Sequence, residues 1–436
     1  MNSGYRLKFK ITWEGLILFI LLIQVFAVQW LAMTYYYCSV INVILLAYLV
    51  GHYKRIKKIG ISDLPFALFL LYGLIQLVRP GANLSVLNNN MLYVATSLLI
   101  VVTLASFSLN RKNLRRSFAS IFPIVNIYII LNIPILILQM NGHIELSGRH
   151  AVENTNPYKA DLICGLFGYN GTPILATFVA FFFVYNLWYY RHKIKKKYKT
   201  IFLIYYVLLF GFYLFIAVPS QNSGYFLVLA MFFVLYYLSR HSNYGYLMQK
   251  IRKSIKGIAI VVLMIIITVI LYNHYAPFYE TVNKIRNVIN IGTTNYYLTG
   301  SYITGSAERF AMVTYYLTND TNKLFGVGIG SMRWKEQLGF GFLHFGQSDM
   351  GPFLLIGGLV FVVLLTLIFA NAVNSLCNSR FLMILECTLM LGMLLFTQLF
   401  TNISTAISFM LFIVVCSLEK EVSNEDEEDT KALLIR

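Results

Sequence analysis

Arg309 and His344 carry side chains of the types that bind an anion and transfer a proton. A guanidinium group offers two parallel N–H donors to phosphate oxygens and keeps its positive charge at physiological pH. An imidazole with an ordinary pKa of about 6.5 accepts or donates a proton close to neutral pH. Both residues lie in one polar stretch of an otherwise apolar chain. Their types and placement predict a site that binds an anion and moves a proton.

The polar stretch runs from about 277 to 349 and is rich in Gly, Thr, Asn, Tyr and charged residues. Ser306 is suited to cap a helix that starts there, and Glu308 suits the positive end of that helix. Further along, the Gly326–Gly330 run (G-x-G-x-G) predicts a tight turn whose backbone comes close to a substrate. The run has no following Lys-Ser or Lys-Thr, so it does not indicate a P-loop for ATP.

These residues also have structural interpretations. Arg309 could be a surface residue paired with Glu308, and a lone His such as His344 is often structural. Asp349, at the start of an apolar segment, would then cap a helix. In the functional interpretation His344 is the base, with Asp349 and Glu308 as weaker candidates. In the same interpretation, Gln347, Ser348 and Asp349 would hydrogen-bond sugar hydroxyls.

The rest of the chain has the composition of an integral membrane protein. Of its 436 residues, 58% are hydrophobic and 12% are charged, whereas soluble domains carry about 25% charged residues. A bilayer core requires about 20 apolar residues per helix. Segments of this kind predict an all-α protein with about twelve transmembrane helices, at 14–33, 35–51, 64–79, 90–108, 119–140, 172–190, 200–218, 222–239, 256–275, 349–373, 380–398 and 402–418. The first is too long for a signal-peptide core, so we expect it to be retained.

The positions of Lys and Arg predict how these spans are oriented. Basic clusters precede the first span and follow the second, fourth, sixth, eighth and tenth. Such clusters remain on the cytoplasmic side, which predicts that both termini are cytoplasmic. The acidic tail, 419–436, is expected to be solvated and disordered. Because the net charge of +17 is placed in short clusters between apolar spans, nucleic-acid binding is not expected.

The spans and the long connections divide the chain into four parts. Residues 1–275 hold spans one to nine, with an outward loop at 141–171. Residues 276–348 form a large outward loop that contains short helices and the candidate catalytic residues. Residues 349–418 hold the last three spans, and the acidic tail follows.

Glu386 is a carboxylate placed inside a predicted span. A buried charge in a membrane helix is a functional candidate. The alternatives are a hydrogen bond that packs two helices and an ion pair with Arg380. The five cysteines have neither the spacing of a zinc site nor that of a disulfide framework. No metal ion and no cofactor are expected.

Several motifs occur in a characteristic order between about residues 200 and 375. They are a short Ser-containing outward turn (Pro219–Gly224), Glu308-Arg309, the Gly326–Gly330 run, His344 and a Gly-punctuated membrane helix (Gly351–Leu359). In order and sidedness they resemble the Wzy/O-antigen ligase family of bacterial envelope polysaccharide polymerases and ligases. The resemblance implies a GT-C-like glycosyltransferase architecture in the bacterial cytoplasmic (inner) membrane, with an active site that faces the periplasm or the outside.

The resemblance also implies roles for individual residues. Arg309 and His344 would act at the reaction centre. The family often has Ser-Arg in the short turn, where this chain has Gln221, and it commonly has Asn after the His, where this chain has Phe345. The second contact to the diphosphate would then come from a replacement Arg, and further residues would contact the substrate. These replacement and contact residues are Arg79, Arg149, Arg333, Gln221, Ser223 and Gln347.

The function that the resemblance implies is a polysaccharide repeat-unit polymerase. It would transfer an undecaprenyl-diphosphate-linked oligosaccharide onto a hydroxyl of another lipid-linked repeat unit. Its partners would be these donor and acceptor molecules, membrane lipid, and a chain-length regulator and flippase of the same pathway. A ligase would use the same donor with a different acceptor. A lipid-glycan flippase or other transporter, and a non-catalytic scaffold, are the alternatives from other classes.

Overall fold

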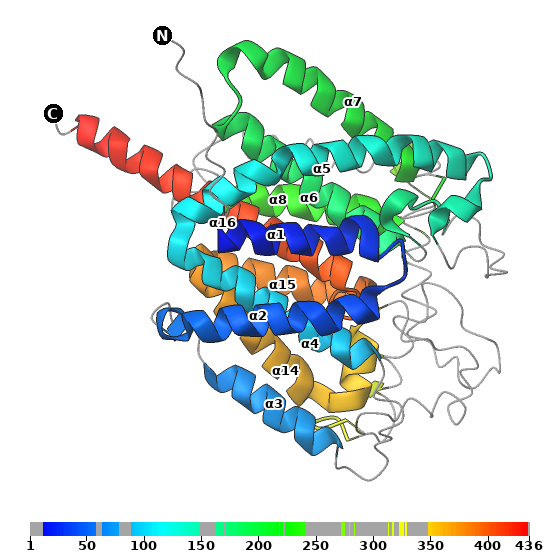
Figure 1. Cartoon of the computed structure of the whole chain (residues 1–436), viewed down its shortest axis with the longest axis vertical. Helices are drawn as coiled ribbons and strands as arrows, with labels where there is room; N and C mark the ends of the chain where they lie inside the picture. The colour runs from blue at the N-terminus through cyan, green and yellow to red at the C-terminus, as the bar shows by residue number, and fades with distance from the viewer. Residues whose placement is uncertain are drawn as a thin grey trace.

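The structure is a computed structural model in which every described element is a helix (Figure 1). It describes residues 12–57, 63–77, 89–148, 162–168, 171–217, 219–220, 223–240 and 348–434, with single residues and short runs between 272 and 328. The main helices are α1 (Trp13–Ile23) with the π-helical continuation η1 (Gln24–Val28), α2 (Thr34–Ile56), α3 (Asp63–Leu77), α4 (Asn89–Ser106), α5 (Arg111–Met140), α6 (Thr172–His192), α7 (Lys199–Ala217), α8 (Ser223–Arg240), α14 (Met350–Cys377), α15 (Arg380–Phe396) and α16 (Ile403–Leu434).

The predicted apolar segments coincide with these helices, apart from 256–275, which lies almost wholly outside the described residues. Within the described part, 6 helical stretches are long and apolar enough to cross a membrane. They are Thr34–Lys54, Met91–Met140, Thr172–His192, Lys196–Ala217, Met350–Cys377 and Ile403–Lys420. The chain is therefore all-helical where it is described, with several helices suited to a multi-pass membrane protein.

The core is built around α16 and α6. In the apolar part of α16, 94% of the residues are buried, against 22% in α7. Buried small polar side chains of α16, such as Ser404 and Ser408, suit close contacts between membrane helices, and α16 packs against α4, α6, α8 and α14. The outer helices α2, α3 and α7 expose Leu, Ile, Val and aromatic side chains on their free faces. That arrangement suits a bundle whose periphery contacts lipid.

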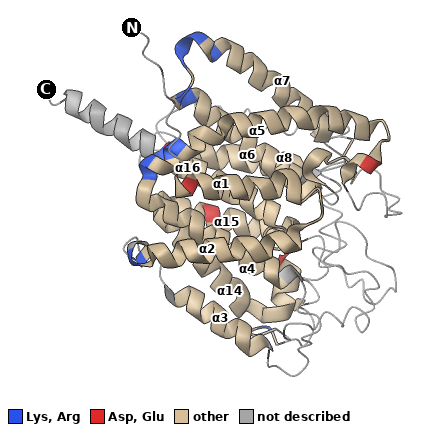
Figure 2. Ribbon diagram, viewed as in Figure 1, with Lys and Arg blue, Asp and Glu red and all other residues tan. Residues whose placement is uncertain are grey.

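The connections between the helices fall at two ends of the bundle, and cations gather at one of them (Figure 2). We call this end the basic end. There the last carbonyls of α14 accept hydrogen bonds from two cations. Arg111 Nη2 donates to Leu376 O (2.8 Å), and Lys420 Nζ donates to Cys377 O (2.7 Å). A cation stabilises the negative end of a helix, so these bonds fix the end of α14 against α5 and α16.

The opposite end holds the α1–α2 and α15–α16 connections and the segment after α5. Gln24 Nε2 donates to Ser404 Oγ (3.2 Å), which joins η1 to the start of α16. Trp30 Nε1 donates to Leu146 O (3.1 Å), which joins the α1–α2 connection to the chain beyond α5. The two ends are therefore chemically different, and the described members of the predicted basic clusters occupy one of them (Figure 2).

The predicted loop 141–171 is packed against the bundle at both of its described ends. Residues 162–168 lie against α5 and η1, and two α5 side chains satisfy their backbone. Gln139 Oε1 accepts a hydrogen bond from the backbone N–H of Gly165 (2.7 Å). Asn132 Oδ1 accepts one from the backbone N–H of Leu166 (2.6 Å). Irregular backbone at membrane depth is tolerated where protein satisfies its polar groups in this way.

The acidic tail corrects a prediction. Instead of being disordered, the chain continues as helix without a break from Ile403 to Leu434. A helix that is already formed extends without a new nucleation cost, and Glu, Lys, Ala and Leu are good helix formers. The end of this helix projects beyond the bundle (Figure 1).

Glu386 is buried, and its described partner is a thiol. The Cys377 Sγ lies 3.6 and 3.5 Å from the two carboxylate oxygens. The bond joins α14 to α15, which is the helix-packing interaction that the sequence left open. Arg380 is exposed and forms no described ion pair with Glu386.

Candidate functional site

Most of the predicted site residues lie outside the described residues. They are Arg79, Arg149, Gln221, Glu308, Arg309, Arg333, His344 and Gln347. Ser223 is the first residue of α8, and Asp349 directly precedes α14.

The described chain neighbours of these residues share one end of the bundle. Gly148, which precedes Arg149, follows the segment that Trp30 binds. Ser220 and Ser348, which flank Gln221 and Gln347, lie in the α7–α8 connection and just before α14. Both connections are at the end opposite to the basic end, and both serines are buried. The chain therefore leads toward these predicted site residues from the same end.

Asp349 fastens the start of α14 to the turn between α15 and α16. One carboxylate oxygen accepts from the N–H of Phe400 (2.6 Å) and of Thr401 (3.2 Å). The other accepts from the Thr401 hydroxyl. The backbone N–H of Asp349 donates to Leu394 O (3.1 Å). All three groups that contact the Asp349 carboxylate are hydrogen-bond donors, which suits an ionised carboxylate.

This geometry favours a structural role for Asp349. Its side chain makes no capping bond to α14 itself, so the predicted cap is instead a bond to a turn 51 and 52 residues further along the chain. The residue is fully buried, and both carboxylate oxygens are engaged. A general base needs a free oxygen that faces its substrate.

We expect Asp349→Asn to lower the free energy of unfolding by about 1–3 kcal/mol, because an amide group replaces one acceptor with a donor. Thermal unfolding in detergent measures the change. Glu145→Gln is the matched control, since Glu145 is exposed and pairs with His143 alone among described residues. An unchanged unfolding temperature together with lost activity would instead assign Asp349 to chemistry.

Of the Gly326–Gly330 run, Gly326 and Gly328 are described. Gly326 closes a turn that begins at Asn322, since Gly326 N donates to Asn322 O (2.7 Å). Gly326 (φ +60°) and Gly328 (φ +107°) are in the left-handed region that favours glycine. The backbone that this turn approaches is that of α14. Gly328 N donates to Ile356 O (2.9 Å), and Leu359 N donates to Lys323 O (3.0 Å).

The helix α14 is broken at the same place. Gly358 has φ 64° and ψ −164°, a conformation that is essentially restricted to glycine. Figure 1 shows the two parts of the helix meeting at an angle. The part after the break, about 19 residues at roughly 1.5 Å per residue, reaches close to the thickness of a bilayer core. The predicted span 349–373 is thus two helical parts joined at Gly358.

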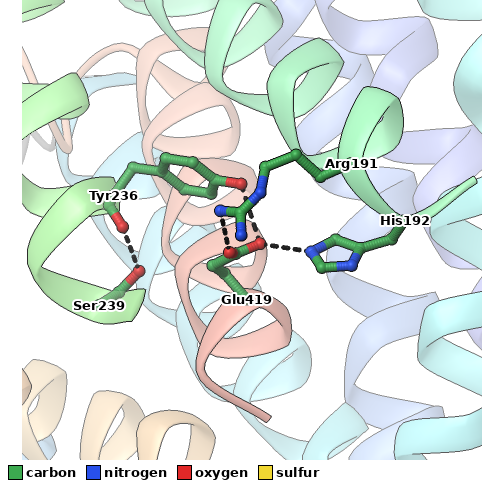
Figure 3. A network of polar contacts seen from close by, with 5 residues as sticks. All are labelled: Arg191, His192, Tyr236, Ser239 and Glu419. Atoms are coloured by element: carbon green, nitrogen blue, oxygen red, sulfur yellow. Dashed lines mark hydrogen bonds and ion pairs between the residues drawn. The ribbon is translucent and has the colours of Figure 1, made fainter. Parts of the chain in front are cut away.

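A second polar cluster, which the sequence did not predict, lies at the basic end (Figure 3). Glu419 of α16 accepts from Arg191 Nη1 (2.5 Å) and His192 Nε2 (2.7 Å) of α6 and from the Tyr236 hydroxyl (2.9 Å) of α8. The Glu419 side chain is 1% exposed. The cluster joins three helices and lies far along the bundle from the predicted site. A Glu directly after an apolar span and an Arg-His pair ending another were its only signals.

The described residues hold no group of three or more His, Cys, Asp or Glu side chains that could bind a metal ion. Comparisons with protein-family models, with curated proteins and with solved structures give no match for this chain. Function is therefore inferred from the residues and contacts of this chain.

Proposed function

We propose that this chain is a membrane glycosyltransferase that polymerises polysaccharide repeat units at the outer face of the bacterial cytoplasmic membrane. It would cross the membrane about twelve times with both termini inside. The donor would be an oligosaccharide linked to undecaprenyl diphosphate, and the acceptor would be a hydroxyl of a second lipid-linked repeat unit.

The observation that carries the proposal is the separation of the bundle into two ends. Lys and Arg gather at the basic end (Figure 2), which suits the cytoplasmic side. The described neighbours of Arg149, Gln221 and Gln347 lie at the other end. A site assembled there would meet a lipid-linked substrate at the outer surface, where cations are otherwise rare.

The proposed chemistry needs two groups. The acceptor oxygen attacks the anomeric carbon, its proton passes to His344, and a new glycosidic bond forms. The bond from that carbon to the diphosphate breaks, and the diphosphate leaves with the electron pair. Arg309 would offset the developing negative charge, aided by Arg79, Arg149 or Arg333. A pre-placed guanidinium stabilises that charge without reorganisation.

A transporter is the rival that one observation favours, because transporters bind substrates at broken helices. In α14, however, the backbone groups at the break are bonded to protein. Leu359 N donates to Lys323 O (3.0 Å), and Val360 N donates to Leu324 O (3.1 Å). These groups are occupied by the polar turn, which favours a structural use of the break.

The direct test uses purified protein in lipid nanodiscs with undecaprenyl-diphosphate-linked repeat units. A ladder of products supports a polymerase. A single transfer to a different acceptor would identify a ligase. Movement of the lipid across a vesicle bilayer without any covalent product would overturn the proposal in favour of a transporter.

We expect Arg309→Lys to lower the polymerisation rate about tenfold or more, because an ammonium group lacks the bidentate fork of a guanidinium. Gel analysis of the product ladder measures the rate at equal membrane abundance. Arg380→Lys, at an exposed Arg of the basic end, is the matched control and should keep the normal rate. A normal rate in Arg309→Lys would remove this residue from the diphosphate site.

A further inference from the structure

Tyr72 and Gln76 lie one turn apart near the end of α3 and face the break in α14. The Tyr72 hydroxyl is 2.5 Å from Gly357 O and 3.1 Å from Phe325 O, so its proton is placed between two carbonyls. Gln76 Nε2 donates to the same Phe325 O at 2.9 Å. Both side chains are buried. A single helix thereby holds the broken helix and the glycine turn at the same time.

These hydrogen bonds satisfy backbone groups that the break in α14 leaves unpaired. A break in a helix leaves carbonyls before it and N–H groups after it without intrahelical partners, and such groups are costly to bury unpaired. At this break, Ile356 O accepts from Gly328 N, while Leu359 N and Val360 N donate to the turn. Tyr72 donates to the next carbonyl before the break, at Gly357.

We call the assembly of Tyr72, Gln76, the described residues of the turn 322–328 (322–326 and 328) and the break 356–360 the α3–α14 joint. Within it Gly326 and Gly358 are in contact, because a Cβ added to Gly326 would lie 2.6 Å from Gly358 N. The Phe69 and Phe361 rings, with centroids 5.1 Å apart, pack α3 against the second part of α14. The joint is therefore closely packed as well as hydrogen-bonded.

The turn in this joint lies between Arg309 and His344 in the sequence. Holding the turn therefore fixes a point of the chain midway between the two residues of the proposed reaction centre. Reacting groups must be held closely, since a displacement of about 1 Å can cost a hundredfold in rate. A hydrogen bond that fixes the position and direction of the turn would therefore affect the rate of the chemical step.

We propose that Tyr72 is a positioning residue for the glycosyl transfer, acting through the α3–α14 joint. This inference rests on the proposed function. Tyr72 itself touches backbone carbonyls of the joint and takes no part in the bonds that form and break. Its hydroxyl holds the turn against the membrane helices, and the turn belongs to the polar stretch that carries Arg309 and His344 in the sequence.

The test is Tyr72→Phe, which keeps the ring and removes the two carbonyl contacts. We expect kcat to fall about tenfold while KM for the lipid-linked donor stays within about twofold, because alignment is lost rather than ground-state binding. Hydrogen exchange should accelerate in peptides that cover 322–328 and 356–360 and stay unchanged in 403–418. Gln76→Met, which removes the bond to Phe325, should shift both measurements in the same direction.

Tyr37→Phe is the matched control, because the Tyr37 hydroxyl also donates to a backbone carbonyl, Ile20 O (3.0 Å), at a different helix pair. It should leave kcat and exchange in the joint unchanged. Faster exchange in Tyr72→Phe with normal kcat would contradict the positioning role. Unchanged exchange would show that Tyr72 does not stabilise the joint. If the wild-type protein made no glycosidic product, both the proposed function and the positioning role would be wrong, and hydrogen exchange would still test whether Tyr72 stabilises the joint.

Discussion

Replacing Glu419 with Gln is expected to lower the free energy of unfolding by about 3–5 kcal/mol, which is the usual loss when one partner of a buried ion pair is removed. The Glu419 carboxylate accepts hydrogen bonds from Arg191, His192 and Tyr236. The side chains of Arg191 and Glu419 are 24% and 1% exposed. Without the carboxylate, the guanidinium stays in a partly buried place with no counter-charge among the described residues, and three helices lose their common contact.

Unfolding in a denaturing-detergent titration measures this loss. The double variant Glu419→Gln with Arg191→Gln provides the control, because groups in one network are not additive. It should lose less than the sum of the two single variants, since no charge remains unpaired. Full additivity would contradict the network. A single variant as stable as the wild type would show that solvent screens the pair.

The second large effect is expected at the break in α14. Gly358→Ala should lower the free energy of unfolding by about 2–5 kcal/mol, from backbone strain together with overpacking. The residue has φ 64° and ψ −164°, and an added Cβ would meet Leu324 O and would lie 2.6 Å from Gly326 N. Both contacts are with backbone, which has little freedom to move aside.

Gly73→Ala is the matched control for this variant. Gly73 lies in α3 beside the same joint, yet a Cβ added there has nothing within 4 Å. Ala in place of a helical Gly with open space beside it should be neutral or stabilising by up to about 1 kcal/mol. Equal unfolding temperatures for the two variants would mean that α14 can straighten at position 358.

The positions of the helices follow from the sequence because a bilayer core sets a minimum apolar length. That constraint predicts segments such as 172–190 and 402–418, where α6 and α16 lie. The gathering of cations at one end was predictable for a similar reason, since basic clusters recur at alternate connections. Both are local properties of the chain and need no knowledge of which helices touch.

The break in α14 was hidden because hydropathy averages over a whole window. Gly357 and Gly358 lower the apolar average little, so 349–373 reads as one continuous span. What decides the conformation of Gly358 is the turn at Gly326, more than thirty residues earlier. A contact at that separation leaves no periodic signal in the sequence.

The candidate site was predictable in part only. Asp349 was singled out for its place before an apolar segment, but its partners Phe400 and Thr401 belong to another turn. Glu419 was assigned to a solvated tail because an acidic run follows it. Its burial depends on Arg191 and His192, which come from a helix that the sequence alone does not place beside α16.

The unbroken length of α16 has a practical consequence for imaging this protein. At about 1.5 Å per residue, its 32 residues measure roughly 48 Å, more than the thickness of a bilayer core. The far portion therefore leaves the bundle as a helical arm (Figure 1). A domain fused in helical register to this arm would lie outside the bundle, where it adds a marker for particle alignment in electron microscopy.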